Sequence, residues 1–166
     1  MWPRRPPRIS SFSYQGFYRY LVTINARNRS TRLASEDVAR ELIAQILSMF
    51  TAQNFEVLAY CVMPDHVHPL LEGTSPEAGL REAVRAWKQR TGYVWKSRTH
   101  SQLWQSGFHD RVLRESDDTR MAVRYVLRNP VRAGLVETVA DYPWLGSSRY
   151  TIAELEAHAG EWNSGE

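Results

Sequence analysis

Apolar positions along the chain follow two periods, one that suits strands and one that suits helices. Runs of aromatic and β-branched residues bounded by polar or turn-forming residues favour strands. Four such runs predict strands over residues 17–24, 55–63, 66–71 and 103–113. Only Pro64 and Asp65 separate the middle two, which predicts an antiparallel hairpin. Gly107 interrupts the last run and predicts a bulge or bend.

Apolar residues spaced three and four apart predict helices between these strands. The first helix begins after Ser35, a suitable N-cap, and ends near residues 53–54. The second is predicted to begin at Ser75, with Pro76 in its first turn, and to lead into an irregular crossover over residues 93–102. One face of the second helix carries Leu80, Val84, Trp87 and Thr91.

A third helix is predicted over residues 119–129, after the fourth strand. Residues 116–118 cap its start, and Pro130 is predicted to end it because proline has no N–H to donate. Its apolar arc consists of Ala122, Val123, Val126 and Leu127. A short helix is expected near residues 152–158.

The order of these elements, β-α-β-β-α-β-α, predicts the fold class. It is that of an α+β protein with a ferredoxin-like split βαβ unit and an added C-terminal helix. The sheet is expected to be antiparallel, with helices covering one face. Residues 1–15 are expected to form a flexible basic arm, residues 16–150 the domain, and residues 151–166 a tail with the short helix.

Composition narrows the class of protein without naming a function. The 166 residues are 43% hydrophobic, which suffices for the core of one domain. No apolar run is long enough to span a membrane, and the single cysteine, Cys61, is expected to be a buried thiol in a reducing cytoplasm. The formal net charge is +3, and of 21 basic residues only Lys88 and Lys96 are lysine. Arginine suits phosphate groups, although a GC-rich genome explains its excess equally well.

Candidate chemistry begins with His66 and His68, which flank Val67 at the start of the third predicted strand. Alternate residues of a strand point to the same face, so both imidazoles are expected side by side, about 6–7 Å apart at the backbone. Two imidazoles at that spacing suit one shared divalent metal ion. On the third predicted helix, Tyr125 and Asn129 are four residues apart and lie on one flank.

Together these residues predict a site for phosphodiester chemistry. The Asn129 amide oxygen is a suitable third metal ligand, and the Tyr125 hydroxyl a nucleophile toward a metal-activated phosphate. Nitrogen and oxygen ligands with an open position suit Mg²⁺ or Mn²⁺, and two histidines also admit zinc.

Simpler interpretations exist for each of these residues. His66 and His68 would be solvent-facing strand residues, Tyr125 a packing residue, and Asn129 a helix C-cap. His109 is either a further polar group near the site or a residue facing solvent at a strand end.

Several segments together resemble one family. Residues 64–68 resemble the histidine–hydrophobic–histidine motif of the single-tyrosine HUH transposases, and residues 125–136 resemble the segment that carries their catalytic tyrosine. Residues 20–29, 104–111 and 142–148 also resemble that family. The subgroup most similar to this chain is the REP-associated tyrosine transposases.

That resemblance implies a metal-dependent single-strand DNA endonuclease and strand transferase that cleaves beside hairpins and forms a 5′-phosphotyrosine. It implies that Tyr125 is the nucleophile, that His66, His68 and Asn129 hold the metal, and that the cofactor is Mg²⁺ or Mn²⁺. The expected partner is single-stranded or hairpin DNA in the bacterial cytoplasm, at the nucleoid, bound by a monomer or a homodimer. The alternative is a module of the same fold that grips structured nucleic acid without cutting it.

Basic residues near the predicted strand ends, on the second helix and in the arm are candidate DNA contacts: Arg5, Arg8, Arg27, Arg29, Arg85, Lys88, Arg111 and Arg114. The chain departs from the family at Pro69, where an aliphatic residue is usual. Because proline cannot donate a ladder hydrogen bond, the strand is expected to end or bulge there, or the metal site to be distorted.

Overall fold

The computed structural model describes residues 11–160 with the exception of residue 115. Arg5 and Arg8, two of the predicted DNA contacts, lie outside the described residues. None of the helices within the described part of the chain combines the length and apolar character that a membrane span requires.

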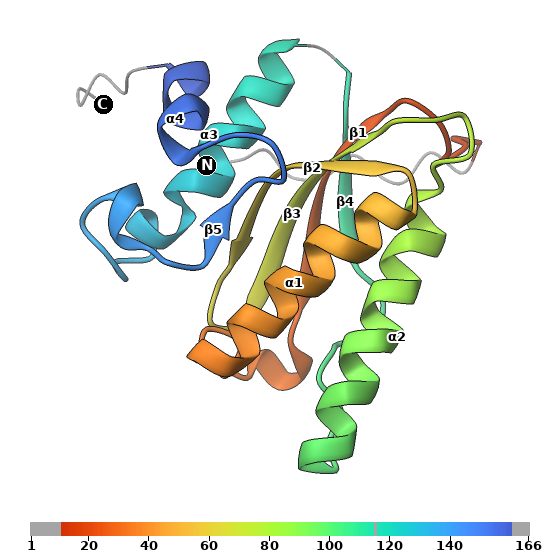
Figure 1. The fold of residues 1–166 in the computed structure, drawn as a ribbon, viewed down its shortest axis with the longest axis vertical. Helices are drawn as coiled ribbons and strands as arrows, with labels where there is room; N and C mark the ends of the chain where they lie inside the picture. The colour runs from red at the N-terminus through yellow and green to blue at the C-terminus, as the bar shows by residue number, and fades with distance from the viewer. Residues whose placement is uncertain (1–10, 115, 161–166) are drawn as a thin grey trace.

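A five-stranded sheet forms the centre of the fold, with the strand order β4-β1-β3-β2-β5 and every neighbouring pair antiparallel (Figure 1). The strands are β1 (Arg19–Asn25), β2 (Phe55–Val62), β3 (His66–Gly73), β4 (His109–Leu113) and β5 (Leu145–Gly146). The helices are α1 (Glu36–Ala52), α2 (Leu80–Thr99), α3 (Ser116–Arg132) and α4 (Ile152–Ala159), with short 3-10 helices η1 (Arg27–Arg29) and η2 (Val139–Asp141). This confirms the predicted α+β class with an antiparallel sheet.

The sheet separates two apolar cores, because successive side chains of a strand point to opposite faces. On one face, Val22 of β1 packs in a cluster with Trp87 of α2 and with residues of α1. On the other face, Leu21 and Leu70 pack with Val126 of α3 and with residues of α4. The added helix that the sequence predicted therefore covers the face opposite to α1 and α2. On that face it packs against Leu70 of β3.

The start and end of α2 differ from the sequence prediction. Residues 75–78 form a turn, in which the Glu77 N–H donates to Ser75 Oγ at 3.2 Å, and the helix begins only at Leu80. The predicted crossover over residues 93–102 is wrong, since α2 continues to Thr99 and ends where His100 adopts a left-handed φ of 56°. The pattern is misleading because the buried positions of α2 stop at Thr91 and the last two turns are largely exposed.

The fourth strand is shorter than predicted. The strand itself is His109–Leu113, while Leu103 and Trp104 are buried in a connecting segment outside β4, where Trp104 forms an isolated bridge with Ala26. Gly107 supplies the expected bend with a φ of 71°. Lys88 of α2 holds this bend, because its ammonium donates to the carbonyl oxygens of residues 105 and 107 at 2.8 and 2.5 Å.

Pro130 does not end α3, contrary to the prediction. It lies in the last turn of the helix, which runs to Arg132. Gly134 follows the end of the helix by two residues, and its φ of 71° suits glycine. The N–H groups of Gly134 and Leu135 donate to the carbonyls of Val131 and Pro130 at 3.0 Å. This pair of bonds is the Schellman motif, in which a left-handed residue turns the chain and satisfies the last carbonyls.

Pro69 does not end its strand either. β3 continues through Pro69 to Gly73, and its pairing with β2 is unbroken from Ala59–Leu70 to Val62–Val67. The irregularity in that pair lies in β2, where the register shifts between Val57 and Ala59. The two-residue strand β5, which pairs with β2 at residues 60 and 61, was not predicted.

Candidate active site

The two histidines lie side by side on the face of β3 that α3 covers. Their ring centroids are 4.6 Å apart, and the rings are nearly perpendicular, at 77°. Leu70, two residues beyond His68, is part of the core beneath α3, while Val67 belongs to the core on the other face. Strand alternation therefore brings both imidazoles to the α3 side, and the side chain of His66 is 14% exposed while His68 is 3% exposed.

His66 is oriented by the residue that precedes it. Its Nδ1 lies 2.6 Å from Asp65 Oδ1, and the other oxygen of Asp65 pairs with Arg29 at 2.9 Å. Burial lowers the pKa of His66 and outweighs the hydrogen bond to Asp65, which raises it. A neutral His66 donates from Nδ1 to the carboxylate, so its Nε2 carries the lone pair.

His68 is oriented by β1. Its Nδ1 lies 3.2 Å from the Val22 carbonyl oxygen and 3.0 Å from Thr23 Oγ1. Burial, with a smaller contribution from neighbouring His66, lowers the pKa of His68 to about 3, so the ring is neutral at neutral pH. A carbonyl oxygen only accepts hydrogen bonds, so Nδ1 carries the proton and Nε2 the lone pair. Both imidazoles thus have Nε2 available as a metal ligand.

The helix α3 brings Tyr125 to this pair. The Tyr125 ring centroid is 5.4 Å from that of His68, and the ring is half-buried. On the same flank, the Arg132 guanidinium lies 4.6 Å from the centroid of the Tyr125 ring. An aromatic hydroxyl, two neutral imidazoles and a guanidinium are therefore gathered between β3 and α3.

Asn129 follows Tyr125 by one helical turn and is 7% exposed. Within the described residues its Nδ2 is a buried polar atom with no hydrogen-bond partner. A buried amide N–H without a partner is costly, which is unusual for a residue with only a structural role. The amide oxygen of the same side chain is the atom that a metal ion would bind. The donor set of two imidazole nitrogens and one amide oxygen fits a divalent metal.

Two of the candidate DNA contacts lie beside this site. Arg27 and Arg29 are in η1, which the Ala26 N–H ties to the hairpin through a 2.9 Å bond to the Asp65 carbonyl. Arg111 shares the α3 face of the sheet but lies against the first turn of that helix, where Asp118 is 3.8 Å away.

The remaining described candidates lie elsewhere. Arg114 is exposed just after β4. Arg85 and Lys88 are on α2, across the sheet from the histidines, and burial lowers the pKa of Lys88, which holds backbone carbonyls. These residues are not brought to the site. His109 pairs with Thr23, so it shares the face of the sheet that carries His68.

Sequence analysis missed three residues that shape the site. Asp65 was assigned only to a turn, although a carboxylate next to a histidine is a usable signal for an orienting partner. Arg132 is seven residues after Tyr125, a spacing that places both on one helix face. Thr23 reaches His68 only through the register of β1 with β3, which no local pattern displays.

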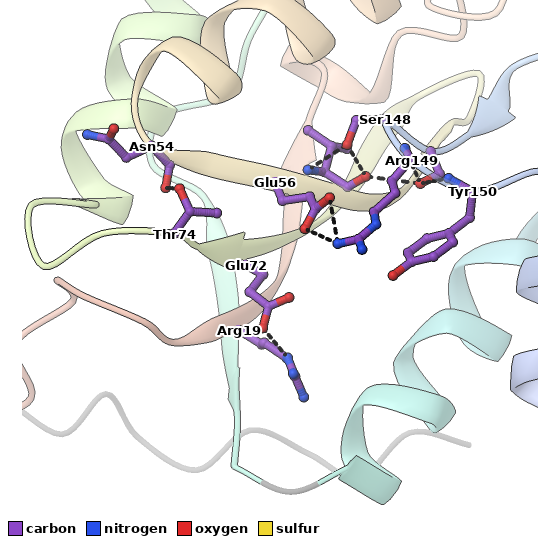
Figure 2. A network of polar contacts seen from close by, with 10 residues as sticks. Arg19, Asn54, Glu56, Glu72, Thr74, Ser148, Arg149 and Tyr150 are labelled. Carbon is purple, nitrogen blue, oxygen red and sulfur yellow. Dashed lines mark hydrogen bonds and ion pairs between the residues drawn. The ribbon is translucent and has the colours of Figure 1, made fainter.

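A polar network lies at the other end of the sheet, and Arg19 connects it to the N-terminal half of α3. Arg19 pairs with Glu72 at 2.9 Å, and Arg149 pairs with Glu56 at 3.5 Å (Figure 2). Arg19 also donates to Thr119 Oγ1 of α3 at 3.3 Å. This side chain therefore links β1, β3 and the helix that carries Tyr125.

Comparison with known proteins gives concordant matches. The family model described as "Transposase IS200 like" matches residues 14–129. A REP-associated tyrosine transposase of Escherichia coli (strain K12) is 30% identical over 129 residues, covering 75% of this chain and 73% of that protein. A solved structure of a REP-associated tyrosine transposase bound to a REP hairpin superposes with a TM-score of 0.75 at 23% identity, covering 97% of this chain and 98% of that one.

Proposed function

The chain belongs to the IS200-like transposase family, as a tyrosine transposase of the REP-associated type, and from that premise we propose how it acts. It cleaves single-stranded DNA beside a hairpin with Tyr125 as nucleophile and rejoins the ends. The observation that carries this proposal is the position of Tyr125, whose ring lies 5.4 Å from the buried His68 beside His66.

His66 and His68 would hold a divalent ion through Nε2, and Asn129 through its amide oxygen. Mg²⁺ or Mn²⁺ suits these ligands, since both accept oxygen and imidazole donors and keep open positions for phosphate. When bound, such an ion stabilises the charge that develops on a phosphodiester under attack. The lowered pKa values of His66 and His68 support this role, because neutral rings keep their lone pairs at neutral pH.

Tyr125 forms the covalent bond. Its Oη attacks phosphorus, the Oη–P bond forms, and the bond from phosphorus to the 3′ oxygen breaks. The phenolic proton is released, and the leaving oxygen takes up a proton to become a free 3′-hydroxyl. The 5′-phosphotyrosine that remains keeps the phosphodiester energy, so the attack of another 3′-hydroxyl rejoins the strand without an external energy source.

Arg132 binds the phosphate that Tyr125 attacks. Its guanidinium is stacked on the Tyr125 ring, and a planar fork of donors suits two phosphate oxygens at once. Cationic donors held in place before reaction stabilise the transition state without reorganisation.

Hairpin DNA is the proposed substrate. The solved relative is bound to a REP hairpin, and the basic residues Arg27 and Arg29 border the site of this chain, with Arg111 further along the same face of the sheet. Phosphate contacts of this kind position nucleic acid without reading its sequence. The enzyme would therefore act on palindromic DNA in the bacterial cytoplasm.

The test is a covalent adduct. The protein is incubated with a labelled hairpin oligonucleotide from the repeats of its own genome, with a single-stranded flank, in Mn²⁺ or Mg²⁺. We expect a labelled protein band that EDTA abolishes and that Tyr125→Phe lacks. Tyr93→Phe, at an exposed tyrosine on α2, is the matched control and should retain the band.

Two results would contradict the proposal. One is an adduct that persists in Tyr125→Phe. The other is tight hairpin binding with no cleavage in either metal, which would identify a module that only binds structured DNA.

A further inference from the structure

The backbone ladder between β1 and β3 is interrupted at one place. Pairing runs from Arg19–Glu72 to Leu21–Leu70, stops, and resumes at Ile24–Val67. In this register Pro69 is opposite Val22, and His68 is opposite Thr23. Pairing of the same residues with β2 is unbroken, as Tyr60–Pro69 and Cys61–His68. The missing hydrogen bond is therefore on the β1 side only.

Proline accounts for this gap. Position 69 directs its backbone groups toward β1, and a residue with an N–H there would donate to the Val22 carbonyl. Proline has no N–H, so that carbonyl receives no ladder bond from β3. Val22 is fully buried, and a buried carbonyl without a donor costs free energy.

His68 occupies the vacant acceptor. His68 directly precedes Pro69 in β3, and its Nδ1 lies 3.2 Å from the Val22 oxygen. We propose that Pro69 is a positioning residue for metal binding: by withholding its N–H it reserves the Val22 carbonyl for the Nδ1–H of His68, which holds Nε2 as the metal-ligating atom. This inference rests on the proposed function, since it concerns the same metal site.

Thr23 alone does not fix the ring in this way. Its hydroxyl, 3.0 Å from Nδ1, either donates or accepts a hydrogen bond, so it is compatible with both tautomers of His68. A carbonyl oxygen is compatible only with the tautomer that carries the proton on Nδ1. The selection of the tautomer therefore comes from Val22, and Val22 is free for that role because of Pro69.

The two imidazoles proposed to bind the metal are thus oriented by different hydrogen-bond acceptors. A carboxylate holds His66, at 2.6 Å from Asp65, and a backbone carbonyl holds His68. With an N–H at position 69, the ladder bond would occupy one of the two acceptor sites of the Val22 oxygen and draw that oxygen toward β3, so the bond from His68 Nδ1 would weaken. The Nε2–H tautomer of His68 would then gain population and lose its metal-binding lone pair.

The test uses metal-free protein with ¹⁵N-labelled histidine, because imidazole ¹⁵N shifts distinguish the two tautomers. In the natural chain we expect His68 with the proton on Nδ1. In Pro69→Val and Pro69→Ala we expect a mixture of tautomers and a new, exchange-protected amide at position 69. Because both variants regain the N–H but differ in volume, a shared response identifies the N–H as the cause.

Affinity for Mn²⁺, measured by titration calorimetry, is the second measurement. Partners that orient metal ligands contribute 10–100-fold, so both variants should bind about tenfold more weakly. His66 is the internal control, because Asp65 holds it and its ¹⁵N signals should not change. Pro76→Ala, at an exposed proline in the turn before α2, should change neither the His68 signals nor the affinity.

The outcomes separate this inference from the proposed function. An Nε2–H tautomer in the natural chain would overturn the inference, as would unchanged His68 signals in both variants with the new amide protected. Failure of the adduct assay alongside the expected tautomer shift would overturn the proposed function but leave the role of Pro69 in orienting His68. The amide spectrum of each variant reports whether the fold is intact.

Discussion

At the scale of single residues, the site depends on the groups that orient its two histidines. His66 and His68 offer the same nitrogen, yet one is oriented by a neighbour in sequence and the other by a neighbouring strand. The lowered pKa of each ring has burial as its main cause, which favours the neutral form. Orientation and neutrality together leave the Nε2 lone pair of each imidazole available, as the proposed metal site requires.

Asp65→Asn is expected to weaken Mn²⁺ binding by about tenfold, because the amide is a weaker acceptor and removes the ion pair with Arg29. Titration calorimetry on the free protein measures this change. Asp37→Asn, at an exposed position in the first turn of α1, is the matched control and should bind the metal as the natural chain does. Equal affinity in Asp65→Asn would show that His66 needs no carboxylate partner.

At the scale of elements, α3 is the helix on which the site depends. Its tyrosine, its asparagine and Arg132 lie within its last three turns, and the Schellman motif at Gly134 ends it after Arg132. The sequence indicated the helix, its apolar arc and the shared flank of Tyr125 and Asn129. It misplaced the end, because proline is tolerated in a last turn whose remaining carbonyls are satisfied by the residues that follow.

Gly134→Ala is expected to destabilise the protein by about 1 kcal/mol, because an L side chain in a left-handed conformation is strained. Chemical denaturation measures the loss. Gly92→Ala is the contrasting control: this glycine is inside α2, and an added Cβ would meet Trp104 at an ordinary 3.6 Å. Its replacement should be neutral or stabilising by about 0.5–1 kcal/mol. Equal effects in the two variants would contradict the C-cap assignment.

At the scale of the whole molecule, the sheet determines which residues meet. Alternation along β3 sends Val67 to the core under α1 and α2, and sends the histidines toward α3. That alternation was readable in the sequence, as were the element order and the pairing of β2 with β3. The cross-strand register was not readable in the sequence, so the partners of His68 and the position of His109 could not be predicted. The short β5 carries too few residues to leave a pattern.

The predicted partners His68 and Tyr125 come from segments far apart in sequence and lie in contact between β3 and α3. Of the scattered basic residues, charge alone did not separate those near the histidines from those across the sheet. Lys88, for example, is used to hold a bend rather than left free on a surface. Its distinguishing feature is a tertiary contact, which composition does not report.

Peptide mapping tests whether Tyr125 becomes covalently joined to DNA. The adduct formed with a hairpin oligonucleotide is trimmed with nuclease, digested with trypsin and analysed by mass spectrometry. Cleavage after Arg124 and Arg128 releases a peptide that begins at Tyr125. We expect a nucleotide linked through phosphate to Tyr125 in this peptide. A nucleotide on any other residue, or an unmodified Tyr125 peptide from protein that has cut its substrate, would contradict this expectation.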